Sequence, residues 1–400
     1  MYPDRPSVTL DGTPALGPWL REREVAGSAL LLVDDGVTGT AIEDAVIDQL
    51  RSAGTSVERR VVSARGSASH PAERHRVVVG IGGGGVIDQA KLTCLLGSGD
   101  GARRRLGATQ RCGLVALPRD VRRPQHLVLV PTTVGTGAHV SPNACLEVRG
   151  AKRLVNGDCL RADAAVLDPA AVAALPGWLL AEGALENLAR VAGVYAGDEL
   201  DVPAADALVE EVVRDVVRLG YRADDAMDPA GRAELLAMSG RTHGADLVEG
   251  RALYIDKCWP LANELSTGLG IRKVQAIAIV LPALWRAIET GTTAAGSARR
   301  LARLWDVVRA AAPVALPESA GSGLAALVAH WRIGLDDAAR AVGDQSLEEV
   351  VDRLAGGAVR AWGAGLPMLR GLDHAAVAAL YRDGLLTTQD SGAASAVPAG

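Results

Sequence analysis

In the first half of the chain, short apolar runs alternate with stretches of helical periodicity. SALLLVD at 28–34, RVVVGI at 76–81 and HLVLVP at 126–131 are almost continuously apolar. Between them, 41–54 and 86–97 have the spacing of helices, and Gly54 is placed to end the first one. Strands that are apolar throughout and separated by helices are typical of a parallel sheet covered on both faces. The pattern therefore predicts an α/β domain.

The pattern changes near Pro176. From there Ala, Leu, Arg and Glu recur at helical spacing, and no convincing strand is present. We predict an α/β domain over 1–177, an all-helical domain over 178–386 that begins near Trp178, and a disordered tail over 387–400.

Composition and charge exclude several classes of protein. The net charge of −5 favours neither a nucleic-acid backbone nor an anionic membrane. No apolar stretch is long enough to span a bilayer, and the N-terminus lacks the apolar core of a signal peptide. The five cysteines form no CxxC pair, which indicates reduced thiols. We expect a cytoplasmic protein.

Lysine is scarce, as a GC-rich coding bias would produce. Only four of the 42 Lys and Arg residues are lysine. Where arginine has replaced generic surface lysines, a lysine that remains is somewhat more often required for its ammonium group. The four are Lys91, Lys152, Lys257 and Lys273.

The strongest local motif is the run of four glycines at 82–85, between a predicted strand and a predicted helix. Glycines let the backbone approach a phosphate, and the N-terminus of a helix offers N–H donors and a positive dipole. The alternative is a tight turn, although four consecutive glycines exceed what a turn needs. The motif predicts phosphate binding.

A second motif, PTTVGTGAHVSP at 131–142, follows another apolar strand. It places Thr132, Thr133 and Thr136 where parallel α/β sheets bind ligands, at the carboxyl end of a strand. A capping turn with a glycine hinge is an equal alternative when the motif is taken alone.

Taken in order, these motifs resemble those of the iron-containing alcohol dehydrogenases. GGGGVIDQAK is similar to that family's GGGSxxDxAK, and PTTVGTGAHVSP to its PTTxGTGSEVTP. LRADAAVLDPAAVAALP and GLGIRKVQAIAIVLP resemble two further family segments. The resemblance is good over about 28–195 and again over 259–282. It implies a dehydroquinate synthase-like fold, with a dinucleotide-binding α/β domain, an all-α C-terminal domain and an active site in the cleft.

The resemblance also implies contacts with a bound NAD cofactor. Glycines would cradle the pyrophosphate, threonines would line the adenosine and nicotinamide side, and Lys152 would contact a ribose. Asp34 would face the adenosine ribose, where a carboxylate favours NAD over NADP. The alternative is that Asp34 and Asp35 only form a turn before Gly36. The implied cofactor-binding residues are Asp34, Gly83, Gly84, Gly85, Asp88, Thr132, Thr133, Thr136 and Lys152.

The sequence departs from the family at the metal site. The family uses an Asp, a His four residues later and two further histidines, and the matching positions here are Glu186, Arg190, Trp259 and Lys273. A nearby family histidine is replaced by Asn263. Trp and Arg do not ligate metals, and a charged Lys repels them. We therefore expect no metal, with Arg190 and Lys273 acting on an oxyanion or a carboxylate. A collapsed site held by a Glu186–Lys273 bridge is the alternative.

His139 is the second departure, because the family usually has Glu at this position of the threonine motif. An imidazole there is a natural proton acceptor for an alcohol. His243, which lacks such a context, is interpreted as structural. The catalytic set predicted from the sequence is thus His139, Lys273, Arg190 and Glu186.

Together these features predict a metal-independent, NAD-dependent alcohol dehydrogenase, which we expect to be a homodimer acting on a small-molecule or peptide substrate. The narrower expectation is natural-product tailoring, as in the dehydrogenases of daptide-type peptide pathways, where oxidation of a β-hydroxy acid precedes loss of CO₂. Two alternatives stay open: a sugar-phosphate cyclase-like lyase that uses NAD transiently, and an NAD-binding pseudoenzyme or scaffold.

Overall fold

The computed structural model describes residues 7–64, 66, 72–148, 150–252, 254–363 and 365–395. The chain forms two compact units. The α/β unit comprises Met1–Gln110, Leu114–Leu175 and Asp228–His243. The helical unit comprises Arg111–Gly113, Pro176–Met227 and Gly244–Gly400.

A six-stranded sheet with the order β1-β9-β6-β4-β2-β3 forms the centre of the α/β unit, and every neighbouring pair in it is parallel. The predicted parallel sheet is thus confirmed, and the three apolar runs form β2, β4 and β6. The strands span Val8–Asp11 (β1), Gly27–Asp34 (β2), Thr55–Val62 (β3), Val77–Gly82 (β4), His126–Pro131 (β6) and Ala164–Leu167 (β9).

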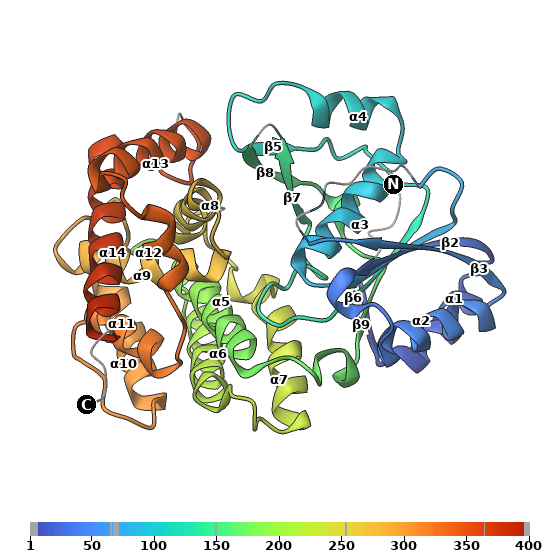
Figure 1. Cartoon of the computed structure of the whole chain (residues 1–400), viewed down its shortest axis with the longest axis horizontal. Helices are drawn as coiled ribbons and strands as arrows, with labels where there is room; N and C mark the ends of the chain where they lie inside the picture. The colour runs from blue at the N-terminus through green and yellow to red at the C-terminus, as the bar shows by residue number, and fades with distance from the viewer. Residues whose placement is uncertain are drawn as a thin grey trace. The chain divides into compact units, whose positions relative to one another are not determined.

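Helices cover both faces of this sheet, as the continuously apolar strands require. Figure 1 shows α1 and α2 on one side of the sheet and α3 on the other. Leu31 and Val33 of β2 belong to the core formed with α1 and α2, whereas Leu30 and Leu32 belong to the core formed with α3. Successive side chains of a strand point to opposite faces, so one strand contributes to two cores. The helices span Leu16–Glu22 (α1), Ala41–Ser52 (α2) and Gly84–Leu96 (α3).

A second, three-stranded sheet with the order β5-β8-β7 completes the α/β unit together with helix α4. Strands β7 and β8 form an antiparallel hairpin, and β5 pairs with β8 in parallel. These elements span Asp100–Gly107 (α4), Leu114–Ala116 (β5), Asn143–Val148 (β7) and Ala151–Asn156 (β8).

In the helical unit, helix α9 packs against α5, α8, α10, α11 and α14. Residues 274–285 of α9 are all buried, which explains why this segment is almost purely apolar. None of the helices in the described part of the chain is long and apolar enough to cross a membrane. The helices span Gly177–Tyr195 (α5), Pro203–Arg222 (α6), Cys258–Leu269 (α8), Lys273–Glu289 (α9), Ala298–Ala311 (α10), Ala320–His330 (α11), Asp336–Val342 (α12), Leu347–Trp362 (α13) and His374–Ser395 (α14).

The two units do not follow the predicted boundary at residues 177/178 strictly. Helix α7 (Pro229–Arg241) lies within the segment predicted as the helical domain, yet it belongs to the α/β unit. The buried Arg232 explains this placement, because its guanidinium donates to the carbonyl oxygen of Leu175 at the end of that unit. Conversely, Gly113 joins the helical unit because its N–H donates to the carbonyl of Ala361, at 2.6 Å.

The predicted disordered tail also differs from the structure. Helix α14 continues to Ser395, so residues 387–395 are helical rather than irregular. This stretch contains no proline, and the first one that would interrupt a helix is Pro398. Residues 396–400 lie outside the described part of the chain.

Candidate functional site

The glycine motif and the threonine motif meet at one edge of the six-stranded sheet. Gly82 ends β4 and Pro131 ends β6, and the two residues are partners in the parallel register. A Cβ atom on Gly83 would lie 3.2 Å from the side chain of Thr133, and one on Gly84 would lie 3.1 Å from that of Thr136. The predicted ligand-binding residues of two separate loops are therefore adjacent.

Asp34 lies at the same edge, at the end of β2. Its Oδ1 accepts a hydrogen bond from Gly36 N at 3.1 Å, and its Oδ2 accepts one from Gly83 N at 3.4 Å. Burial raises the pKa of this carboxyl above its usual value, although the two backbone donors act in the opposite direction. The structure thus brings Asp34 to the glycine loop, and its contact with an adenosine ribose stays a prediction.

Helix α3 is held by contacts that explain its sequence motif structurally. A Cβ on Gly85 would lie 2.3 Å from the carbonyl oxygen of Ala64, so this glycine is needed for close packing whether or not a ligand binds. Asp88 accepts a hydrogen bond from Cys145 N at 2.9 Å, which joins α3 to β7.

Lys91 fixes the far end of the threonine motif. Its fully buried ammonium group donates to the carbonyl oxygens of Ser141, at 2.8 Å, and Asn143, at 2.7 Å. Burial lowers its pKa to about 8. The lysine of the GGGGVIDQAK motif therefore positions the loop that follows β6.

Helix α7 supports the threonine motif within the α/β unit. Gly135 N donates to Ser239 Oγ at 2.6 Å, and His243 Nε2 lies 3.2 Å from the carbonyl oxygen of Thr136. Gly137 has a φ of +56°, and a Cβ there would collide with the His243 ring. His243, interpreted from the sequence as structural, therefore contacts the motif directly. Nothing in its local sequence indicated this contact, because it depends on the return of α7 to this unit.

Two further predicted residues of this unit, His139 and Lys152, lie away from the glycine loop contacts described above. His139 is 1% exposed, and its Nε2 lies 3.2 Å from the position of a Cβ on Gly240 of α7. Lys152 lies on β8 opposite Glu147 of β7. Among the described residues, no hydrogen bond or ion pair joins Lys152 to the glycine loop. Its predicted contact with a ribose stays a prediction.

In the helical unit, a charged cluster forms around Glu186 of α5. Lys273, the first residue of α9, places its Nζ 2.8 Å from Glu186 Oε1. Arg190, one turn further along α5, places an Nη2 at 3.5 Å from the same oxygen. The structure thus brings together three of the four predicted catalytic residues in this unit. This arrangement is compatible with both alternatives stated above. The two cations can act on a substrate oxyanion, or the Glu186–Lys273 bridge can hold a collapsed site.

A second ion pair lies next to this cluster. Arg272 donates from Nη2 to Glu182 Oε1 at 2.8 Å and also contacts Asp337, with an Nη1–Oδ2 distance of 3.1 Å. Burial raises the pKa of Glu182, which the Arg272 charge partly offsets. Because this pair joins α5 to the residue just before α9, next to the Glu186–Lys273 bridge, it provides a matched comparison for that bridge.

Asp256 is a candidate residue that the sequence reasoning missed. Its Oδ1 accepts a hydrogen bond from Cys258 N at 2.8 Å, just before α8, and lies against Gly193 of α5. Burial raises its pKa to about 6, while the nearby charges of Lys273 and Arg190 act to lower it. A carboxyl that titrates near neutrality beside two cations is a candidate acid or base. The local sequence, IDKCW, resembles an ordinary helix cap.

The residues present fit a dinucleotide but not a metal ion. The bare backbone at the N-terminus of α3, flanked by threonine side chains, suits a pyrophosphate. In contrast, the Glu186 carboxylate faces two cations, and Trp259 has no ligating atom. In the described ranges, no group of three or more His, Cys, Asp or Glu side chains could hold a metal.

The fold is that of the solved alcohol dehydrogenases of the iron-containing class. The chain superposes on the NADH-dependent butanol dehydrogenase A of Thermotoga maritima with a TM-score of 0.77 and 18% identity, covering 95% of this chain and 97% of the other. At this level of identity the likeness defines the fold.

The sequence of the α/β unit shows the same resemblance. Residues 13–169 match the family model of the iron-containing alcohol dehydrogenases, which confirms the resemblance stated above for this part of the chain. Among curated relatives, a phosphonoacetaldehyde reductase of Streptomyces viridochromogenes is 31% identical over 221 residues, 53% of each chain. Long-chain-alcohol dehydrogenase 1 of Geobacillus thermodenitrificans is 27% identical over 207 residues, 47% of this chain and 49% of the relative. The matches thus span about half the length of these two relatives.

Proposed function

We propose that the protein is an NAD-dependent dehydrogenase that oxidises an alcohol to a carbonyl compound without a bound metal. The observation that carries the proposal is the placement of Lys273 and Arg190 around Glu186, at the positions matched to the family's metal ligands. The fit of the glycine and threonine loops to a dinucleotide supports the cofactor. The activities of the two relatives, a long-chain-alcohol dehydrogenase and a phosphonoacetaldehyde reductase, support the reaction class.

The reaction converts an alcohol and NAD⁺ into a carbonyl compound, NADH and a proton. Bound NAD⁺ would supply the hydride acceptor. Lys273 and Arg190 would stabilise the negative charge that develops on the substrate oxygen, which is the electrostatic role a metal ion has elsewhere. A group of this chain must also accept the hydroxyl proton. His139 was predicted for this step, and Asp256 is the second candidate because it lies beside the two cations.

Net formation of NADH tests the reaction class. A cyclase-like lyase would regenerate NAD⁺ in each turnover, and a pseudoenzyme would bind NAD without forming NADH. The finer proposal, oxidation of a β-hydroxy acid at the end of a peptide, rests on the same two cations, which suit a substrate carboxylate.

We expect the protein to bind NAD at least tenfold more tightly than NADP, because the Asp34 carboxylate would repel a 2′-phosphate. Two unit charges about 4 Å apart interact by about 1 kcal/mol in water and more when partly buried. Asp34→Asn keeps an acceptor for Gly36 N–H but removes the charge, so it should reduce the ratio of the affinities for NAD and NADP. Calorimetry with both cofactors measures the effect.

Asp48→Asn is the matched control, because Asp48 is an exposed carboxylate on α2 that is not among the groups acting on Asp34, and it should leave the preference for NAD unchanged. Equal or tighter binding of NADP by the unaltered protein would show that Asp34 does not face the adenosine ribose.

A further inference from the structure

A dense run of arginine lies between α3 and β6 along the chain. Residues 103–123 contain seven arginines and a single acidic residue, Asp120, whereas the whole chain has a net charge of −5. This stretch comprises most of α4, the strand β5 and the loops next to them. A concentrated charge on a protein of opposite net charge is typical of a binding surface.

Two of the seven arginines have acidic partners. Arg123 Nη1 lies 2.6 Å from Asp163 Oδ2, and both side chains are buried. Arg103 of α4 forms ion pairs with Asp100 and Glu73. These two arginines stabilise the local structure, so their charges are already balanced within the α/β unit.

Arg104 and Arg105 occupy the outer side of α4. Ala102 and Leu106, which are one turn apart, are buried in the small core that α4 shares with β5 and β8. The two positions between them therefore point away from this core. Both arginines are exposed, and neither forms an ion pair with any of the residues that the structure describes.

Arg119 and Arg122 lie in the turn that follows β5. Val121 N donates to the carbonyl oxygen of Pro118 at 3.2 Å, and Arg122 donates to the carbonyl oxygens of Arg119 and Val121. Both arginines are exposed, and Arg119 has no ion pair within the described ranges. The turn thus presents two more guanidinium groups to solvent.

These four arginines belong to neighbouring segments. Arg105 Nη1 donates to the carbonyl oxygen of Ala116 at 2.7 Å, which joins α4 to the end of β5. Leu117, directly before the turn, packs in the same small core as Leu106, and Figure 1 shows α4 next to β5. We call the group the arginine surface, and it consists of Arg104, Arg105, Arg119 and Arg122.

The surroundings of the arginine surface disfavour a nucleic acid or a membrane. Single-stranded nucleic acids stack on aromatic side chains, and residues 100–125 contain no Phe, Trp or Tyr. Membrane surfaces are bound through large apolar side chains beside the cations, and none is exposed among the described residues from α4 to β8. A long duplex would extend past the arginines and meet the negative charge of the rest of the chain.

We propose that the arginine surface docks a short acidic peptide segment. A guanidinium fork matches the geometry of a carboxylate. One exposed ion pair is weak, so docking requires several carboxylates at once. Alternate side chains of an extended peptide lie about 6.6 Å apart on one face, which lets one segment contact arginines of both α4 and the turn. The inference goes beyond the proposed reaction, because docking requires neither NAD nor turnover.

Binding of a fluorescein-labelled octaglutamate peptide to the full-length protein, followed by fluorescence anisotropy, tests this assignment. The peptide should bind at about 50 mM NaCl and more weakly at about 300 mM, because salt screens exposed charges. Arg104→Glu/Arg119→Glu should weaken binding about tenfold or more, since two attractive contacts become repulsive. Neither side chain makes a hydrogen bond or ion pair with the described residues, so the melting temperature should stay nearly unchanged.

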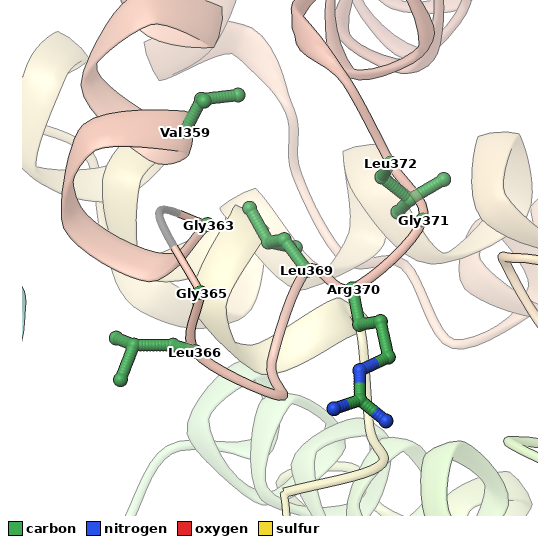
Figure 2. A pocket seen from close by; sticks show the side chains of 8 residues that line it. All are labelled: Val359, Gly363, Gly365, Leu366, Leu369, Arg370, Gly371 and Leu372. Carbon is green, nitrogen blue, oxygen red and sulfur yellow. The ribbon is translucent and has the colours of Figure 1, made fainter.

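Arg51→Glu/Arg370→Glu is the matched control, because both side chains are exposed and the change in net charge is the same. Arg51 lies in the last turn of α2, and Figure 2 shows the Arg370 side chain extending away from the loop between α13 and α14. This variant should bind the peptide within about twofold of the unaltered protein, because distant exposed charges are screened. Equal weakening by both double variants would identify a general attraction and reject a docking surface.

Two further probes test the class of partner. Octathymidylate and vesicles that contain phosphatidylserine should bind more weakly than octaglutamate, because the surface lacks aromatic and exposed large apolar side chains. Tighter binding of either probe, lost in Arg104→Glu/Arg119→Glu, would overturn the peptide assignment. Absence of octaglutamate binding at the lower salt concentration would overturn the surface itself. Since no turnover is measured, none of these outcomes depends on the proposed dehydrogenase reaction.

Discussion

Lys273→Ala should lower kcat by about 10²–10³, the loss measured when one preorganised oxyanion donor is removed. The affinity for NAD should stay nearly unchanged, because the glycine and threonine loops belong to the other unit. Lys273→Arg should restore only part of the activity, since a planar fork replaces a compact ammonium. Steady-state kinetics together with NAD calorimetry measure both effects.

Arg272→Ala is the matched control for this prediction. It removes the neighbouring bridge to Glu182, which joins α5 to the residue just before α9, so it should lower the melting temperature with little effect on kcat. In the double variant Glu186→Gln/Lys273→Ala, a neutral amide replaces the buried carboxylate, so no charge at position 186 is left without Lys273. Stability should then recover while kcat stays low. A Lys273→Ala protein that is destabilised yet fully active would identify the Glu186–Lys273 pair as packing only.

Asp256→Asn should lower kcat for alcohol oxidation by about 10² or more, within the range for loss of a positioned proton acceptor. The pKa of Asp256 is raised to about 6, so the carboxyl is ionised above that pH and protonated below it. A proton acceptor must be ionised. Oxidation should therefore be nearly constant above pH 7 and fall about tenfold per pH unit below 6. Reduction of the carbonyl needs the protonated form and should fall above pH 6.

His139→Gln separates the two candidate proton acceptors. If Asp256 accepts the proton, Asp256→Asn removes the acid limb of the pH profile and His139→Gln preserves it. The opposite pair of results would assign the proton to His139 and leave Asp256 as a helix cap.

Much of the α/β unit could be predicted because its signals are local. Apolar runs bounded by glycine or proline became β2, β4 and β6, and the glycine and threonine motifs met because carboxyl ends of neighbouring parallel strands share an edge. The scarcity of lysine also carried information, since Lys91, Lys257 and Lys273 each donate to a specific oxygen acceptor.

The rest depends on contacts between distant segments. Glu186 and Lys273 are 87 residues apart, and only the family resemblance, not their spacing, suggested that they meet. The burial of His139 and the contact of His243 with Thr136 both follow from α7 packing on the α/β unit. The pattern of apolar and polar residues in α7 does not indicate which unit this helix packs against. Asp256 was missed because burial in the folded chain, rather than its sequence context, raises its pKa.

The central claim is hydride transfer without a metal. Its most direct test is the formation of NADH, followed by absorbance, in full-length protein treated with a chelator and analysed for metal content, with a panel of primary and secondary alcohols and aliphatic hydroxy acids. We expect NADH formation that depends on the alcohol, in protein containing far less than one metal ion per chain, with no change on adding Fe²⁺ or Zn²⁺. The contrary result is one metal ion per chain, with metal and activity lost together on chelation and both recovered when the metal is added back.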